Sequence, residues 1–260
     1  MTLFAAAVGL LSIVIAWGVT LRLFSLARRT RSLPERLLAI GFSSLFCVGY
    51  PLAGASRAPG MAGTVEGSLF FACGAIGMVT GTIALGRFPL VVFRPGSSWA
   101  KGLSVAIALS GSIAGTGCAV TVARSHTTAE MITNIHAWAL LLMSTLAVCF
   151  LWHAVESSLY FGRMKKRLAL GLARPDTTYR FLLWALASWC NFGMVATIAV
   201  LRATGVAILS ALPMTIIALG SLVTSFCWWL AFFMPRSLEV RLPGAAADGR
   251  SALQAPSPRD

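Results

Sequence analysis

The chain has 260 residues, of which 57% are hydrophobic and only 11% are charged. Soluble domains carry about 25% charged residues, and a water-soluble fold of this size could not hide so much apolar surface. The composition therefore excludes an ordinary soluble protein and favours a protein embedded in lipid. The formal net charge of +13 would also suit a nucleic-acid-binding protein, so the positions of the charges must decide between the two classes.

Seven stretches of the chain are long and apolar enough to cross a bilayer, which takes about 20 residues per helix. In chain order they are residues 2–21, 37–55, 67–86, 102–123, 137–158, 181–201 and 207–234. Long uninterrupted apolar runs satisfy their backbone groups in lipid only as helices, because the strands of a membrane barrel alternate in polarity. We therefore predict an all-α, polytopic membrane bundle of seven transmembrane helices over residues 1–235. The Ala-, Gly-, Pro- and Ser-rich residues 236–260 are predicted to form a flexible cytoplasmic tail.

Lysine and arginine are divided unequally between the two sets of alternating connections. One set, which includes residues 22–36 and 163–180, carries 18 of the 21 basic residues, and the other carries only Arg57, Arg124 and Arg202. Because basic loops stay in the cytoplasm, we predict the N-terminus outside, the C-terminus in the cytoplasm, and a multi-pass protein of the cytoplasmic (inner) membrane. The basic residues then fix topology and contact anionic lipids of the bilayer, and no nucleic-acid partner is predicted. Arginine outnumbers lysine 18 to 3, which is typical of GC-rich bacterial genomes.

The fifth helix is predicted to begin near residue 128, where Thr127 and Glu130 have the spacing of a capping box. It has no breaker before Gly162 and can run on to Gly171, which would project a basic, partly apolar arm into the cytoplasm. Five basic side chains are expected to contact a cytoplasmic protein partner or anionic lipid there: Arg163, Lys165, Lys166, Arg167 and Arg180.

Local signals predict further details of the helices. Asp176 is expected to cap the sixth helix and Ser97 or Ser98 the fourth, and Pro213 is expected to kink the seventh.

Small residues and aromatic residues predict how the helices pack. The pairs Gly77/Gly81 and Gly111/Gly115 permit close helix packing inside the bundle, while the oligomeric state is left open. Trp99, Tyr179 and Trp184 are expected in an interfacial aromatic belt. The six cysteines lie in apolar stretches and are expected to be buried free thiols.

Ionisable groups at membrane depth are costly and are functional candidates. His153 and Glu156 lie three residues apart on one face of the fifth helix, a geometry suited to a proton relay or to binding a polar ligand. Alternatively, Glu156 pairs with Arg163 or Arg180 near the cytoplasmic interface. Asn191, near the middle of the sixth helix, either bonds to a neighbouring helix or contacts a ligand, and we expect it to face one interior cavity with His153.

Metal and cofactor chemistry has little support in the sequence. His126, Glu130 and His136 are of types that could hold a metal ion, but Glu130 already has a capping role, so no metal site is predicted. No lysine lies inside a predicted helix to carry a retinal Schiff base, and no two histidines sit on facing helices to ligate haem. The motifs G-x-S-x-G and H-E-x-x-H and the P-loop do not occur. We predict no catalytic residue and no cofactor, and we do not expect an enzyme.

Two of the predicted cytoplasmic segments contain distinctive runs of residues. Residues 92–100 read VFRPGSSWA, residues 168–175 read LALGLARP, and residues 180–184 read RFLLW. They resemble the FRP-x-S-x-W-A and LGL-x-x-P-x-x-x-x-RF-x-LW segments of a family of uncharacterised bacterial seven-helix integral membrane proteins. The second of these segments joins helices five and six. The resemblance covers most of the chain and implies a shared seven-helix bundle, without implying an activity.

Three functional hypotheses follow from the sequence. The leading one is a receptor-like or sensory membrane protein that acts through a separate cytoplasmic partner, by analogy with other seven-helix sensors. The second is a small-molecule transporter or channel, although seven helices do not divide into two equal repeats. The third is a membrane enzyme that acts on a lipid substrate, with His153 and Glu156 as acid and base.

Overall fold

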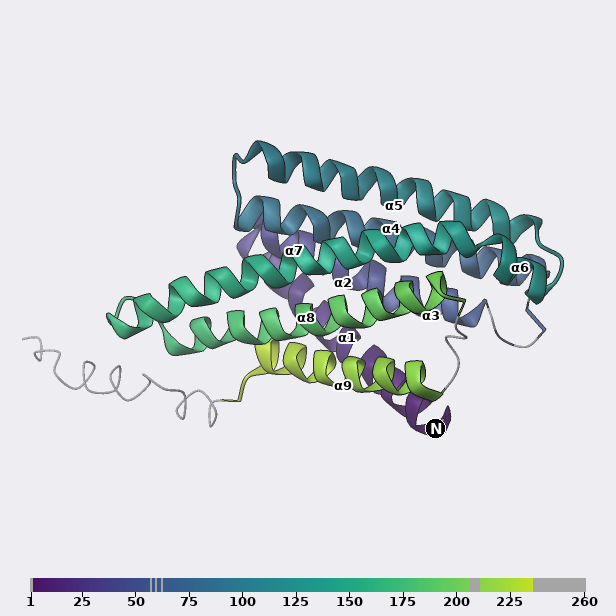
Figure 1. Cartoon of the computed structure of the whole chain (residues 1–260). Coiled ribbons are helices and arrows are strands. Elements are labelled where there is room, and N and C mark those ends of the chain that lie inside the picture. Colours follow the sequence, from purple (N-terminus) through teal and green to yellow (C-terminus); the bar gives the residue numbers. More distant parts are fainter. Residues whose placement is uncertain (1, 57, 59, 62, 206–210, 236–260) are drawn as a thin grey trace, which may run out of the picture.

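The computed structural model describes every residue except 1, 57, 59, 62, 206–210 and 236–260, and the described part is all-helical (Figure 1). The elements in chain order are α1 (Thr2–Thr30), α2 (Leu33–Phe42), the π-helix η1 (Ser43–Gly49), α3 (Tyr50–Ala55), α4 (Val65–Val92), α5 (Ser98–Arg124), α6 (Thr128–Asn134), α7 (His136–Ala169), α8 (Pro175–Ala203) and α9 (Ala211–Phe233). Within the described residues, seven spans are long and apolar enough to cross a membrane, with α2, η1 and α3 forming one of them. The predicted all-α bundle with seven such helices is confirmed. The predicted tail, and residues 207–210 of the predicted seventh helix, lie outside the described residues.

The seven spans form a closed ring in chain order. Each packs against the next, and α9 returns to pack against α1, while α4 also contacts α7 across the ring. α5 therefore packs on the outside of α4 and α7. The other six spans surround the interior of the bundle, which we call the lumen. Figure 1 shows Thr2 of α1 and the end of α9 at opposite ends of the bundle, as an odd number of crossings requires. We call the end where α1, α4, α7 and α9 finish the basic end, because the loops with Arg31, Arg94 and Arg174 lie there.

The outer surface of the bundle is apolar. Leu10 on α1, Leu109 on α5 and Phe226 on α9 are each at least 60% exposed. In water, exposing this apolar surface would cost a free energy of roughly 25 cal/mol per Å², whereas in lipid it carries no such cost. The exposed apolar side chains therefore support contact with a lipid bilayer.

Several helices extend beyond the apolar stretches that predicted them. α1 continues to Thr30, so Arg22 and Arg29 lie on its last turns rather than in a loop. α7 has 34 residues, which at 1.5 Å per residue is about 50 Å, against a hydrocarbon core of about 30 Å. The helices therefore continue past the apolar stretches by which hydropathy predicted them.

The predicted start and end of the fifth helix are largely correct. The amide of Glu130 donates to Thr127 Oγ1 at 3.2 Å, and the Glu130 carboxylate accepts from the amide of His126 at 2.9 Å. A break at Ile135, however, separates α6 from α7. At the other end, the amides of Gly171 and Leu172 donate to carbonyls of the last turn of α7, and Gly171 has a φ of +69° that favours glycine.

One of the predictions of local helix geometry is wrong. The N-cap of α8 is Arg174 rather than Asp176, because Pro175 occupies the first helical position, where its missing N–H costs nothing. Pro213 lies in the first described turn of α9, and the predicted kink would involve residues 207–210, which lie outside the described residues. Ser97 is the N-cap of α5, as one of the two predicted alternatives.

Glycines bring the second span into close contact with α4. A methyl group added at Gly77 would lie 2.8 Å from the carbonyl oxygen of Ser44, and one at Gly81 would lie 2.7 Å from Leu45 Cβ. Both contacts are with η1, the π-helical turn in the middle of this span. Pro51 follows directly; its ring needs room at the carbonyl four residues earlier, and the wider π turn provides it. The predicted close packing of Gly77 and Gly81 inside the bundle is confirmed.

The cysteine prediction is correct in the main. All six thiols are free, and Cys47, Cys118, Cys149 and Cys227 are buried. Cys73 is exposed on the outer surface, where a lipid-facing thiol is still in apolar surroundings.

Candidate functional site

The lumen holds a large pocket at the basic end, which we call the basic-end pocket. Its volume is about 590 Å³, within the range of small-molecule sites. Its lining is part apolar and part charged, and comes from α1, α2, α4, α8 and α9: Arg22, Leu23, Ser25, Leu26, Arg29, Pro34, Glu35, Leu38, Phe88, Val92, Phe93, Thr177, Arg180, Phe181, Trp184, Ala231 and Phe232.

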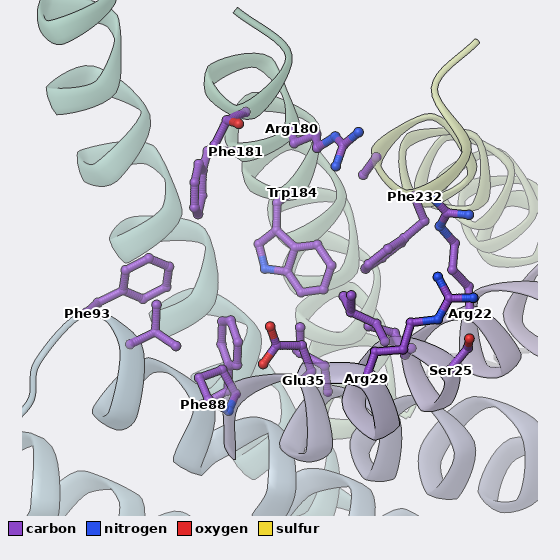
Figure 2. A pocket seen from close by; sticks show the side chains of 17 residues that line it. Arg22, Ser25, Arg29, Glu35, Phe88, Phe93, Arg180, Phe181, Trp184 and Phe232 are labelled. Atoms are coloured by element: carbon purple, nitrogen blue, oxygen red, sulfur yellow. The ribbon is translucent and has the colours of Figure 1, made fainter. Parts of the chain in front are cut away.

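The charged groups of this pocket lie on different sides of it. In Figure 2 the guanidinium groups of Arg22 and Arg29 lie on the α1 side beside Phe232, while the Glu35 carboxylate lies below Trp184 near the aromatic wall. Among the described residues, Glu35 makes no ion pair with these arginines. Its Oε2 atom is buried without a hydrogen-bond partner, and so is the indole Nε1 of Trp184. The pocket therefore offers one free acceptor and one free donor beside cationic groups.

An aromatic layer closes the inner end of the basic-end pocket; it consists of Phe42, Phe46, Trp184, Trp228 and Phe232. The Trp228 ring lies 4.6 Å from the rings of both Phe42 and Phe46. Phe42 also lies 5.9 Å from Trp184, whose ring is 5.7 Å from Phe232. Phe42 is only 1% exposed. These five rings leave little open space in the middle of the lumen.

The aromatic layer depends on the π-helical turn. Phe42 directly precedes η1 and Phe46 lies within it, so both rings come from the segment that the α4 glycines hold close. A regular α-helix would present these positions at different angles. Trp184, which sequence reasoning assigned to an interfacial belt, instead belongs to this interior layer, whereas Trp99 is 54% exposed and fits the belt.

A second pocket of about 530 Å³ lies on the other side of the aromatic layer, and we call it the opposite-end pocket. Phe46 and Trp228 line it, together with residues of α1, α3, α7, α8 and α9. Its polar groups are neutral: Ser225 donates to Ser12 across the pocket wall at 3.0 Å, and Asn191 contributes its amide. Thus two pockets of similar volume share one aromatic floor.

His153 lies behind the wall of the basic-end pocket. Its Nε2 is 2.8 Å from the carbonyl oxygen of Leu85 on α4, and because a carbonyl only accepts, Nε2 carries the proton. The ring of His153 stacks on Phe88, with 5.6 Å between the ring centroids. His153 is therefore tied to α4 and supports a wall residue of the pocket.

Asn191 and His153 both line a small interior void of about 10 Å³ next to the aromatic layer, which is room for about one water molecule. The Asn191 Nδ2 donates to the carbonyl of Ala187, 2.9 Å away on its own helix. The expected hydrogen bond from Asn191 to a neighbouring helix is therefore absent among the described contacts. Of the three residues predicted to bind a ligand or relay a proton, Asn191 lines one of the two large pockets, whereas His153 and Glu156 line neither.

Glu156 is paired, but with a different arginine from those expected. Its carboxylate accepts from Arg94 Nε at 2.7 Å, and the Arg94 guanidinium also lies over the Trp99 ring. Neither Arg163 nor Arg180 forms a described ion pair with Glu156. The sequence places Arg94 62 residues away, and only the contact between α4 and α7 brings the two charges together.

The five basic residues predicted to contact a partner or lipid divide into two groups. Arg163, Lys165, Lys166 and Arg167 lie exposed near the end of α7. Arg180 instead lies on α8, half-buried at the basic-end pocket, with its Nη2 3.9 Å from Asp176. In Figure 1 the α7–α8 turn extends beyond the ends of α4, α5 and α9. We call residues 162–174 the basic arm.

Sequence reasoning missed Glu35, the arginines of α1, and the aromatic layer as parts of a site. Glu35 gave a weak signal, as a carboxylate after Pro34 inside an arginine-rich segment. The aromatic residues gave none, because isolated Phe and Trp in apolar spans are ordinary. Within the described residues, no three His, Cys, Asp or Glu side chains are grouped as a metal site would need.

The fold and the lumen define the class as an all-α membrane bundle with interior pockets. Comparisons of the chain with protein-family models, with curated proteins and with solved structures found no match. The likeness of segments 92–100 and 168–184 to the bacterial seven-helix family stays an expectation.

Proposed function

We propose that the protein is a multi-pass membrane transporter that carries a small solute through the lumen of its helix ring. The observation that supports this proposal is the pair of large pockets at opposite ends of one lumen, separated by a layer of five aromatic rings. A path across a membrane needs an opening at each side and a barrier between them. An apolar constriction is an effective barrier, because water and ions leave it readily.

The proposed orientation follows the positive-inside rule. The basic end would face the cytoplasm, with the N-terminus outside and the C-terminus inside, in the inner membrane of a bacterium. The basic-end pocket would then open to the cytoplasm and the opposite-end pocket to the outside.

Solute uptake by proteoliposomes tests the proposal. Purified protein is reconstituted and incubated with an aqueous metabolite extract of the source cells, and the trapped solutes are identified by mass spectrometry. We expect at least one solute to enter faster than into protein-free liposomes. Failure of every solute to do so would reject transport.

A matched pair of glycine variants links uptake to the lumen. Gly9 lines the opposite-end pocket and has no atom within 4 Å of an added Cβ, so Gly9→Trp should fill the pocket without a backbone clash and stop uptake. Gly102, on α5, is equally exposed and free of neighbours but does not line either large pocket, so Gly102→Trp should leave uptake unchanged. Equal uptake by both variants would place the path elsewhere.

The basic arm favours a second candidate function, that of a receptor-like protein with a cytoplasmic partner. Leu170 and Leu172, at the turn, are each 73% exposed beside the five basic residues of the arm, and apolar groups beyond the membrane depth are unusual without a partner. A photo-crosslinker at Leu172 should capture one protein stoichiometrically in native membranes, and charge reversal at Lys165 and Lys166 should abolish the capture. A crosslinker at the lipid-facing Leu109 serves as the control.

The proposal of a lipid-modifying enzyme has the weakest support. Its two residues have separate partners, since His153 bonds to Leu85 and Glu156 to Arg94. Acid–base catalysis by this pair would require both contacts to break.

A further inference from the structure

We propose that the basic-end pocket binds a zwitterion that carries an apolar, aromatic-sized body, of which an aromatic α-amino acid is the simplest example. The inference concerns the proposed transporter's substrate class, and so rests on the proposed function for its biological meaning. The binding chemistry itself stands on the groups that line the pocket.

The carboxylate of Glu35 specifies a cationic donor. Its Oε2 is buried without a partner, and a buried acceptor that lacks a hydrogen bond costs about 1–3 kcal/mol or more when charged. Among the described residues no arginine or lysine pairs with it. An ammonium group of a solute would satisfy both its charge and its lone pairs.

The arginines of the pocket differ in their availability. Arg22 lies over the Phe233 ring, 5.1 Å from its centroid, and Arg180 lies within 3.9 Å of Asp176. Arg29 has no ion pair or ring contact among the described residues, and its guanidinium lies across the pocket from Glu35 (Figure 2). A solute carboxylate would pair with Arg29 in a charge-assisted hydrogen bond.

The apolar part of the solute would lie against the aromatic wall. Phe88, Phe93, Phe181 and Trp184 form this wall beside Glu35 (Figure 2). The unpartnered Nε1 of Trp184 gives the wall one donor, suited to a carbonyl or carboxylate oxygen. A simple inorganic anion would leave the wall and Glu35 unsatisfied, and an apolar molecule would leave all the charges unsatisfied.

The inference is tested by equilibrium binding of radiolabelled L-phenylalanine to the protein in nanodiscs of phosphatidylglycerol, a lipid whose headgroup has no ammonium group. Competition by 3-phenylpropionate, which lacks the ammonium, and by phenethylamine, which lacks the carboxylate, measures each charge separately. We expect saturable binding of phenylalanine, with each analogue at least about tenfold weaker, because each leaves one charged group of the site unpaired.

Two charge-removing variants should respond in opposite ways. Glu35→Gln should weaken the binding of phenylalanine about tenfold and leave the binding of 3-phenylpropionate unchanged. Arg29→Gln should weaken the binding of phenylalanine and of 3-phenylpropionate and leave the binding of phenethylamine unchanged. Glu66→Gln, at the far end of α4, and Arg28→Gln, which does not line this pocket, are the matched controls and should bind like the wild type. Thermal midpoints of all four variants show whether each is folded.

Phosphatidylethanolamine presents the same chemistry, since its headgroup is a zwitterion on an apolar body. Adding it to the nanodiscs separates the two sources. If phosphatidylethanolamine displaces phenylalanine, and the displacement depends on Glu35 and Arg29, the zwitterion site is supported and assigned to a lipid headgroup. If it does not displace phenylalanine, the site is assigned to a free solute.

The inference is overturned if the wild type binds neither phenylalanine nor phosphatidylethanolamine. It is also overturned if Glu35→Gln weakens the binding of 3-phenylpropionate and of phenethylamine equally. Its failure differs from failure of the transport proposal. Binding without uptake would retain the zwitterion site and reject transport, whereas uptake that is indifferent to Glu35→Gln would retain transport and reject the zwitterion site.

Discussion

The two pockets of the lumen have similar volumes and share an aromatic floor, yet their chemistry differs. The basic-end pocket carries three arginines and one carboxylate, whereas the opposite-end pocket carries only neutral polar groups. Pairs of side chains near the two ends show the same contrast. Arg94, just after α4, forms an ion pair with Glu156 of α7 near the basic end, and a hydroxyl pair joins α1 to α9 at the other end. One lumen thus combines a charged pocket with a neutral one.

Removing the barrier between the pockets should have the largest effect. Trp228 is 7% exposed and contacts both Phe42 and Phe46, so Trp228→Ala should join the two pockets and raise the permeability of proteoliposomes to a small neutral solute such as glycerol more than tenfold. Stopped-flow light scattering measures the permeability.

The neighbouring tryptophan provides the control for this experiment. Trp229 is 42% exposed on the outer face of α9, so Trp229→Ala should leave permeability unchanged. Equal leaks in the two variants would mean that the aromatic layer does not separate the pockets.

Loss of the ion pair should have the next largest effect, confined to stability of the basic end. Glu156 is buried, and Glu156→Gln leaves Arg94 without its charged partner, which should lower the free energy of unfolding by about 1–3 kcal/mol. Thermal unfolding in detergent, followed by a thiol-reactive dye that reaches the buried cysteines, gives the midpoint.

An exposed ion pair at the same end serves for comparison. Arg174 of the Arg174–Asp176 pair is 78% exposed, and surface pairs contribute little, so Arg174→Gln should change the midpoint hardly at all. If it lowers the midpoint as much as Glu156→Gln does, burial is not what makes the Arg94 pair important.

The smallest effect is expected at the hydroxyl pair of the opposite-end pocket. Ser225→Ala removes the bond to Ser12 and should cost about 0.6 kcal/mol, the average for hydrogen bonds between membrane helices. Ser12→Ala should cost the same, and the double variant no more than either alone. Ser188 serves as the control, because its hydroxyl bonds within its own helix and not to Ser225. The losses of unfolding free energy from Ser188→Ala and Ser225→Ala should therefore add in the double variant.

Sequence reasoning succeeded where the apolar composition of a segment and the lipid around it are enough to decide its structure. Twenty apolar residues in lipid form a helix whatever their neighbours, so the seven spans, their order and the exposed arm with Lys165 and Lys166 were predictable. The same holds for caps such as Thr127 with Glu130, since these involve residues a single turn apart.

The candidate site was predicted poorly, because it depends on contacts between distant segments. Glu156 was correctly expected to pair with an arginine, but the partner is set by the packing of α4 on α7. His153 and Asn191 were singled out for their polarity at membrane depth, and both line the small void beside the aromatic layer. Glu35, Arg29 and Trp184 lie near the ends of their spans, where polar and aromatic residues are common, so nothing in the sequence distinguished them.

The sequence by itself determined that this protein is an all-helical bundle with seven spans suited to lipid, since hydropathy is a local property. Only the tertiary structure decided that the spans close into a ring, that a π turn held by Gly77 and Gly81 places Phe42 and Phe46 in its centre, and that Glu35 faces arginines of α1 across a pocket. Those features arise from packing between helices far apart in the chain. Side-chain volume and backbone approach govern such packing, and neither is visible in a single stretch of residues.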